Sequence, residues 1–262
     1  MSRLVQFMRA VQIHRCGPLT PGFTGLQLDS LPIPSPARDE VLIKVAVCGV
    51  CRTDLDEIEN RAAPARLPLT PGHQVVGKVV AQGPGCDPSV MGKRVGVAWV
   101  YSACGSCAPC RAGLENLCFE FKASGRDTPG GYAEYMIAPQ AYIHAVPEAL
   151  TDHQAAPLLC AGAVGYRALN LTSLRDGETL GLTGFGASGH LVLQMARFLF
   201  PRSPVYVFAR SASEQDFALT LGAHWAGDTR EHPPAPVNAM IDTTPAWLPV
   251  VCALEALAPG GR

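Results

Sequence analysis

The chain has 262 residues and a formal net charge of −1, with its charged residues scattered along the sequence. This length allows one large or two ordinary domains, and the scattered charge provides no basic patch for nucleic acid, so we expect small-molecule partners. The start of the chain lacks the apolar core of a signal peptide, and no apolar run reaches the ~18 residues of a membrane span. We therefore expect a cytoplasmic protein with no nucleic-acid or membrane partner.

The spacing of apolar residues along the sequence changes after residue 150. Up to that point, short apolar runs such as 41–47 and 75–80 are separated by Pro and Gly, which predicts a small β-barrel. From Thr151 onward helices and strands alternate, which predicts a parallel sheet. The predicted helices span 154–170, 191–200 and 214–221, and the predicted strands span 180–183, 205–208 and 239–242. We therefore predict a β domain at 1–150 and an α/β domain at 151–262.

The run CGSCAPCRAGLENLC places four cysteines at C-x2-C-x2-C-x7-C spacing: Cys104, Cys107, Cys110 and Cys118. Thiolates at this spacing can point at one centre and form the all-sulfur tetrahedral shell that Zn²⁺ accepts. Disulfides are the alternative, but cysteines this close have poor disulfide geometry, and nothing indicates secretion. We predict a structural zinc site, because four protein ligands leave no position for a substrate.

A glycine motif, Gly184-Phe185-Gly186-Ala187-Ser188-Gly189, follows a predicted strand and precedes a predicted helix. In a GxGxxG turn, the first glycine (Gly184) allows the tight turn. The second (Gly186) lets a pyrophosphate approach the backbone, and the third (Gly189) permits close packing of the helix on the strand. A glycine-rich turn without a ligand is the simpler alternative. The strand–turn–helix context favours dinucleotide binding.

The residues about 20 positions beyond the glycine motif bear on the choice between NAD and NADP. An acidic residue there would bind the adenosine ribose, but this chain has Ala209-Arg210-Ser211. A guanidinium and a hydroxyl can hold a 2′-phosphate, so Arg210 and Ser211 favour NADP over NAD. The alternative is that Arg210 is an ordinary solvated charge.

Three dispersed residues are candidates for a catalytic zinc site with an open position: Cys51, His73 and Cys160. Taken singly, each is more simply a core thiol or a surface imidazole, and their spacing proves nothing. Six segments, however, carry a resemblance: CGVCRTDL, LPLTPGHQVVG, the four-cysteine run, GGYAEY, AAPLLCAGAVGYRAL and GFGASGH. In this order they resemble zinc-dependent alcohol dehydrogenases of the medium-chain dehydrogenase/reductase superfamily.

The resemblance implies a GroES-like catalytic domain followed by a Rossmann domain, with the active site in the cleft between them. It implies reversible hydride transfer between a primary alcohol or aldehyde and NAD(P)(H), and a homo-oligomer in the intact family. Cys51, His73 and Cys160 match its catalytic zinc ligands. The four-cysteine run matches its structural zinc ligands, so each chain would hold one zinc ion of each kind.

Four further positions match family residues with known tasks. Thr53 matches the hydroxyl that takes the alcohol proton, and otherwise is a capping hydroxyl. Asp54 matches a carboxylate that orients the histidine ligand. Arg52 matches a residue that meets the coenzyme pyrophosphate, and otherwise is a solvated cation. Trp99 matches a ring that narrows the alcohol pocket, although an aromatic residue in a strand can equally belong to the core.

The sequence departs from the family at three places. The residue after the zinc histidine is often Glu in the family and is Gln74 here, so a carboxylate able to approach the metal is lacking. Where some members end a proton relay with histidine, this chain has Asp56, which could still accept a proton. Family members continue beyond Arg262 into further strands, so we expect an incomplete Rossmann sheet with an exposed edge. Two alternatives stay open: an inactive, truncated zinc-binding homologue, or a dehydrogenase of a polyol or another carbonyl compound.

Overall fold

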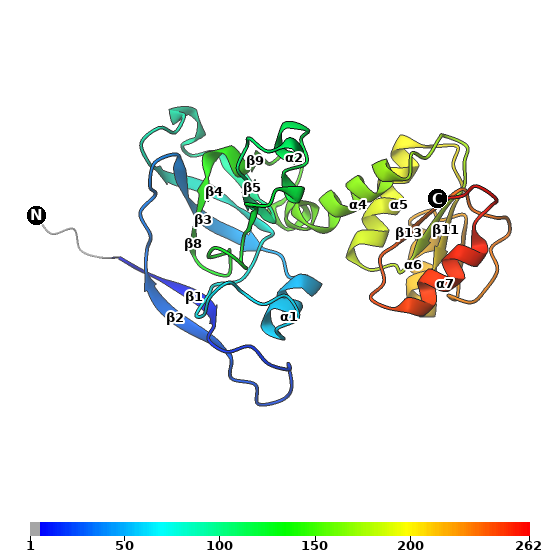
Figure 1. Ribbon diagram of the computed structural model, residues 1–262, viewed down its shortest axis with the longest axis horizontal. Helices are drawn as coiled ribbons and strands as arrows, with labels where there is room; N and C mark the ends of the chain where they lie inside the picture. Colours follow the sequence, from blue (N-terminus) through cyan, green and yellow to red (C-terminus); the bar gives the residue numbers. More distant parts are fainter. Residues whose placement is uncertain (1–5) are drawn as a thin grey trace, which may run out of the picture. The chain divides into compact units, whose positions relative to one another are not determined.

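The computed structural model describes residues 6–262, and the chain divides into two compact units between Cys160 and Ala161 (Figure 1). The first unit is built mainly of antiparallel strands, and the second alternates strands and helices. The predicted combination of a β domain and an α/β domain is therefore confirmed. The domain boundary after residue 150 stays a prediction.

The largest sheet of the first unit has five antiparallel strands in the order β8-β3-β4-β5-β9. Their bounds are β3 Glu40–Cys48, β4 Val75–Gln82, β5 Arg94–Val97, β8 Tyr135–Pro139 and β9 Ile143–Ala145. Val41 and Ile43 on β3 pack with Val75 and Val79 on β4, and all four are at most 1% exposed. Burying such a side chain stabilises the fold by ~1.5–3 kcal/mol, so the alternation seen in the sequence fixes which face of each strand points inward.

Shorter elements of the first unit position its polar residues. The strand pairs are β1 Phe7–Ile13 with β2 Leu26–Pro32, and β6 Val100–Ser102 with β7 Lys122–Ala123. The helices are α1 Arg52–Ile58, α2 Ala108–Arg111 and α3 Asp152–Ala155. The β6–β7 pair closes the segment that contains the four-cysteine run.

The second unit contains a four-stranded parallel sheet in the order β12-β11-β10-β13. Its strands are β10 Leu180–Thr183, β11 Val205–Phe208, β12 Trp225–Gly227 and β13 Ala239–Asp242, and its helices are α4 Ala161–Leu171, α5 Ala187–Leu199, α6 Ala212–Thr220 and α7 Trp247–Ala256. The parallel arrangement predicted from the sequence is confirmed, as are the bounds of β10, β11 and β13.

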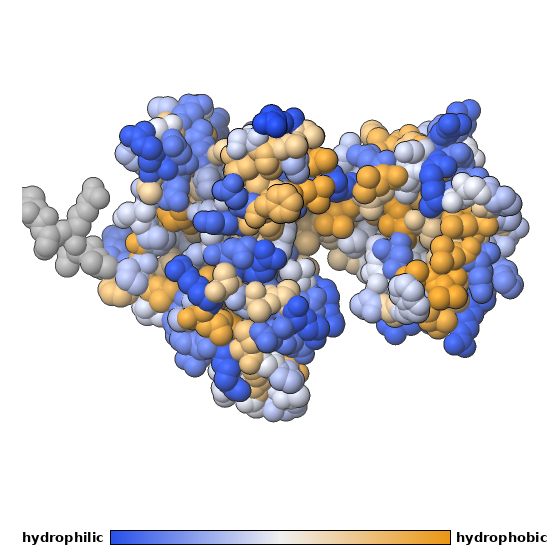
Figure 2. All heavy atoms as spheres, in the orientation of Figure 1, coloured by the Kyte–Doolittle hydropathy of each residue, from blue (hydrophilic) through white to orange (hydrophobic). Residues whose placement is uncertain are grey.

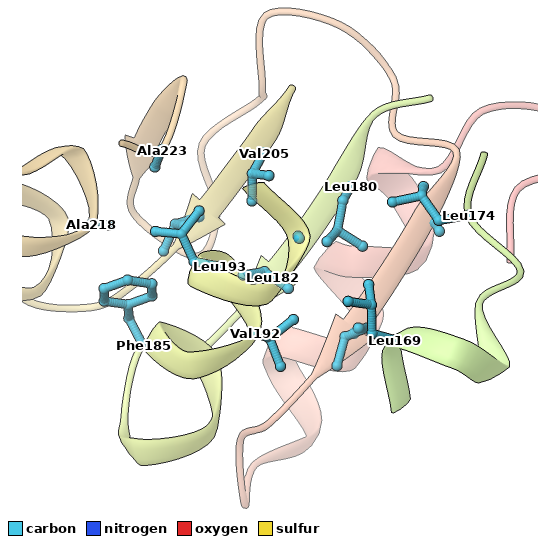
Figure 3. Close-up of a cluster of buried hydrophobic side chains, with 14 of the residues drawn as sticks. Leu169, Leu174, Leu180, Leu182, Phe185, Val192, Leu193, Val205, Ala218 and Ala223 are labelled. Atoms are coloured by element: carbon cyan, nitrogen blue, oxygen red, sulfur yellow. The ribbon is translucent and has the colours of Figure 1, made fainter. Parts of the chain in front are cut away.

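The core of the second unit lies between the sheet and α5. Leu180 and Leu182 on β10 and Val192 and Leu193 on α5 are all 0% exposed and belong to one hydrophobic cluster (Figure 3). This packing places the first turn of α5 directly after the end of β10, which is where the glycine motif lies. In residues 6–262 every helix is too short or too polar to span a bilayer.

The three helices predicted after residue 150 have different bounds, and a fourth helix in that part of the chain was missed. The helix expected at 154–170 is interrupted near Pro157, and Cys160 has a non-helical backbone (φ −130°, ψ −80°). The helix expected at 191–200 begins earlier, at Ala187, and the one expected at 214–221 begins at Ala212. The missed helix is α7, whose outer face exposes Trp247, Leu248, Val251 and Leu254 (Figure 2). Because hydrophobic residues lie on both faces of α7, its sequence shows no helical period.

Candidate active site

The structure brings Cys51, His73 and Cys160 together within the first unit. Cys51 Sγ lies 3.3 Å from His73 Nε2 and 3.9 Å from Cys160 Sγ, and the three ligand atoms all lie within 4.8 Å of one another. A tetrahedral zinc ion with ordinary bond lengths separates sulfur from nitrogen by about 3.6 Å and sulfur from sulfur by about 3.8 Å. The donor set therefore fits one zinc ion and leaves a fourth position open.

Cys51 is held by the first turn of α1, where it is the N-cap residue. Its Sγ accepts a hydrogen bond from Thr53 N at 3.4 Å, and its own N–H donates to Asp54 Oδ2 at 2.7 Å. A helix N-terminus leaves backbone donors free, and a thiolate placed there is stabilised by them. The pKa of Cys51 is lowered to about 4 by a hydrogen bond from the Cys160 thiol and by the His73 side chain. The same contact with Cys51 raises the pKa of Cys160.

His73 is fully buried, and Asp54 lies behind it. Asp54 Oδ1 is 3.4 Å from His73 Nδ1, on the side of the ring away from Cys51, and both side chains are 1% exposed. Burial lowers the pKa of His73, but the nearby Asp54 carboxylate and the contact with Cys51 outweigh it and raise the pKa to about 9. This arrangement directs Nε2 towards the candidate metal position, as the prediction for Asp54 requires.

Arg52, Thr53 and Asp56 surround the same helix start. The Arg52 guanidinium is exposed and bonds to Asp56 Oδ1 at 3.3 Å, and Arg61 bonds to the same oxygen at 2.5 Å. The Oδ1 atom of Asp56 is thus shared by two guanidinium groups. Thr53 contributes its backbone N–H to Cys51, as described above.

Trp99 lies against the candidate catalytic site. Its ring meets the His73 ring edge-on, with centroids 5.0 Å apart at 80°. Phe121 packs beside it with ring centroids 6.3 Å apart, and the Arg126 guanidinium stacks over it at 5.2 Å. Sequence reasoning found Trp99 but missed Phe121 and Arg126, whose positions carry no motif.

Glu57 is a further residue that the sequence reasoning missed. Its side chain is 0% exposed, and neither carboxylate oxygen has a hydrogen-bond partner within residues 6–262. Burial and the charge of Asp54 raise the pKa of Glu57 to about 8. Gln74, at the departure noted above, is also buried, with Nε2 unpartnered. Glu57 lies three residues after Asp54 on α1, so a helical reading of this segment would have placed both carboxyl groups on one face.

The four cysteines of the CGSCAPCRAGLENLC run form a second cluster. Cys107 Sγ lies 3.4 Å from Cys110 Sγ, Cys104 Sγ lies 4.0 Å from Cys110 Sγ, and all four sulfurs lie within 4.8 Å of one another. Backbone N–H groups of Cys107 and Cys104 donate to Cys104 Sγ and Cys118 Sγ at 3.3 and 3.4 Å. Hydrogen bonds from Ser106 and Cys107 lower the pKa of Cys104 to about 6. The cluster has the donor set of a closed zinc site.

The glycine motif has the backbone geometry that its sequence predicts. Gly184 has φ +79°, which only glycine adopts without strain. A Cβ on Gly186, the N-cap of α5, would meet nothing within 4 Å, so this backbone is open to a ligand. A Cβ on Gly189 would lie 2.5 Å from Gly184 O, which explains the close packing of helix on strand.

A cavity of about 590 Å³ opens beside this turn, lined in part by Arg210, Glu214, Asp228 and Arg230. Ser211 caps α6: its hydroxyl accepts from Glu214 N at 3.3 Å and donates to Glu214 Oε2 at 2.9 Å. Sequence reasoning missed Asp228 and Arg230 because β12, which precedes them, was not predicted. The rule that ligands bind at the carboxyl ends of parallel strands would have found them once that strand was known.

The fold and these three sites define a zinc-binding dehydrogenase with a dinucleotide-binding unit, and comparisons with known proteins agree. Residues 37–148 match the alcohol dehydrogenase GroES-like domain. The chain is 42% identical over 259 residues to the probable alcohol dehydrogenase AdhA of Mycobacterium tuberculosis, covering 97% of this chain and 74% of that protein. The chain therefore belongs to the zinc-dependent alcohol dehydrogenase family of the medium-chain dehydrogenase/reductase superfamily.

Solved structures support the same assignment. A thermostable alcohol dehydrogenase from Pyrobaculum aerophilum, solved with cobalt and zinc bound, has a TM-score of 0.87 and 28% identity, over 98% of this chain and 75% of that one. A putative zinc-binding dehydrogenase from Sinorhizobium meliloti, bound to NADP, has a TM-score of 0.85 at the same identity and coverage. Alignments with several other curated alcohol dehydrogenases span only 50 to 54% of their length.

Proposed function

We propose that the protein is a zinc-dependent alcohol dehydrogenase or aldehyde reductase that transfers hydride reversibly between a primary alcohol or aldehyde and NAD(P)(H). The observation that carries this proposal is the cluster of Cys51, His73 and Cys160. Three protein ligands leave one position open, and a zinc ion held there supplies a Lewis acid for the alcohol or carbonyl oxygen. The Sinorhizobium structure holds NADP, in line with a nicotinamide coenzyme.

The remaining residues have distinct tasks in this proposal. Asp54 holds the orientation of His73 from the Nδ1 side. Thr53 takes the proton of the alcohol, and Arg52 meets the coenzyme pyrophosphate. Gly184, Gly186 and Gly189 form the pyrophosphate-binding turn: Gly184 makes the tight turn, Gly186 offers the open backbone at the start of α5, and Gly189 lets the helix pack closely on the strand. Cys104, Cys107, Cys110 and Cys118 hold the structural zinc ion.

The test combines a zinc analysis with a steady-state assay of aldehyde reduction. We expect about two zinc ions per chain, one for each cluster, and turnover that requires a nicotinamide coenzyme. Zinc without turnover, for any alcohol, polyol or carbonyl compound tried, would support the inactive homologue. Comparing NADPH with NADH in the same assay tests the NADP preference, and a clear preference for NADH would contradict it.

Trp99→Ala tests the alcohol pocket. We expect kcat/KM for a bulky secondary alcohol to rise about tenfold relative to ethanol, because one or two carbon atoms of pocket space change selectivity by ~1–3 kcal/mol. The measurement is kcat/KM for a series of primary and secondary alcohols. Phe119→Ala is the matched control, since Phe119 is an aromatic residue that is 99% exposed. An unchanged substrate range in Trp99→Ala would remove this residue from the pocket.

We place the protein in the cytoplasm, because the cysteines of the two proposed zinc sites must stay reduced to bind metal, and a reducing compartment keeps them so. Its partners in this proposal are an alcohol or aldehyde and a nicotinamide coenzyme. Self-association into a homo-oligomer is proposed from the family alone.

A further inference from the structure

Two arginines approach the coenzyme cavity from neighbouring strand ends. Arg210 follows β11, and Arg230 follows β12. The two strands are parallel neighbours, and Phe208 of β11 pairs with Gly227 of β12. Parallel strands end at the same edge of a sheet. Arg210, two residues after Phe208, and Arg230, three residues after Gly227, therefore lie at the same edge. Both arginines line the cavity next to the glycine turn.

Ser211, the other residue predicted to hold a 2′-phosphate, uses its hydroxyl to cap α6. A serine hydroxyl has one hydrogen to donate, and that of Ser211 goes to Glu214 Oε2 at 2.9 Å. The same oxygen of Ser211 accepts from Glu214 N and closes the capping box of α6. The cavity lining includes Arg210 and Arg230 but not Ser211. A second donor for the phosphate must therefore come from another residue.

The free hydrogen-bond donors around the cavity favour Arg230 in this role. Two carboxylates also line it, but each is engaged by nearby donors: Glu214 by Ser211, and Asp228 by the backbone N–H of Arg230 at 3.2 Å. Across residues 6–262, the ion pairs include neither Arg210 nor Arg230. Both guanidinium groups thus keep their donors for a ligand, and two guanidiniums suit a phosphate dianion.

We propose that Arg230 is a specificity-determining residue that binds the 2′-phosphate of NADP together with Arg210, one guanidinium from each strand end. This inference rests on the proposed coenzyme site of the dehydrogenase. It assigns the 2′-phosphate to two arginines and leaves Ser211 as the cap of α6.

The test measures binding without turnover. Isothermal titration calorimetry compares 2′,5′-ADP with 5′-AMP on the zinc-loaded wild type and on the Arg230→Gln, Arg210→Gln and Arg202→Gln variants. We expect Arg230→Gln and Arg210→Gln each to weaken 2′,5′-ADP about tenfold or more, because each loses charge-assisted hydrogen bonds, and to leave 5′-AMP within about twofold. Arg202→Gln is the matched control: Arg202 is exposed on the same unit and pairs with Asp176. We expect it to bind both nucleotides like the wild type.

The possible outcomes separate this inference from the proposed function. If Arg230→Gln binds 2′,5′-ADP as tightly as the wild type while Arg210→Gln does not, Arg230 has no part in the site. If the wild type binds 2′,5′-ADP no more tightly than 5′-AMP, there is no 2′-phosphate site and the inference fails. Neither result changes the turnover assay, which tests the dehydrogenase itself. The ratio of KM for NADPH to KM for NADH gives a second readout, and we expect it to rise in Arg230→Gln.

Discussion

Cys160→Ser is expected to remove the catalytic zinc ion and lower kcat/KM for aldehyde reduction by ~10³-fold or more. The reason is that serine is a poor zinc ligand, whereas Cys160 Sγ lies 3.9 Å from Cys51 Sγ, as two thiolates on one metal do. A metal Lewis acid supplies several kcal/mol of transition-state stabilisation, and each ~1.4 kcal/mol is a factor of ten in rate. The measurements are zinc content by atomic emission and steady-state kinetics.

The control for this change is Cys252→Ser, the same substitution at a free cysteine that lies outside both clusters. We expect it to keep both zinc ions and the wild-type rate. Circular dichroism of Cys160→Ser should show the folded spectrum, because serine fills nearly the same volume as cysteine. Full zinc content and wild-type turnover in Cys160→Ser would refute the assignment of the three-residue site.

Local sequence patterns predicted the parts of these sites whose residues are close in the chain. The glycine motif predicted a tight turn at Gly184, open backbone at Gly186 and close packing at Gly189, and the structure has a positive φ at Gly184, open space beside Gly186 and a close approach at Gly189. The four-cysteine spacing predicted a sulfur cluster that the structure assembles. In both cases the turn geometry over a few residues determines where the backbone or the sulfur atoms lie, and that geometry is encoded locally.

Local patterns could not predict contacts that depend on the packing of distant segments. Cys51, His73 and Cys160 came from the family resemblance, since their spacing contains no information. The stacking of Arg126 on Trp99 joins the β7–β8 loop to the short segment between β5 and β6, and no sequence motif marks it. Arg230 was missed because β12 has only three residues, too few for a periodic signal.

Cys107→Ser is expected to release the structural zinc ion and unfold the segment around it, at a cost of about 4 kcal/mol or more, as metal loss commonly does. The segment has little else to hold it: α2 spans four residues, and Leu117 and Phe119 are 53% and 99% exposed. With so little buried apolar surface, metal binding must supply most of the folding free energy of this lobe.

Limited proteolysis followed by mass spectrometry checks this expectation. We expect new cleavage between Cys104 and Cys118 in Cys107→Ser, loss of one zinc ion and a lower melting temperature. Glu115→Gln is the matched control, because it changes a side chain in the same segment without removing a ligand. Retention of both zinc ions, or wild-type resistance of the lobe to protease, would show that packing rather than metal holds it.

The catalytic cluster should keep its zinc ion in Cys107→Ser, because Cys51, His73 and Cys160 are anchored on α1, on the buried segment before β4 and on the turn before α4. We therefore expect the two candidate metal sites to differ in what they stabilise: one would close a lobe that lacks a core, and the other sits on elements that the core of the first unit already holds in place.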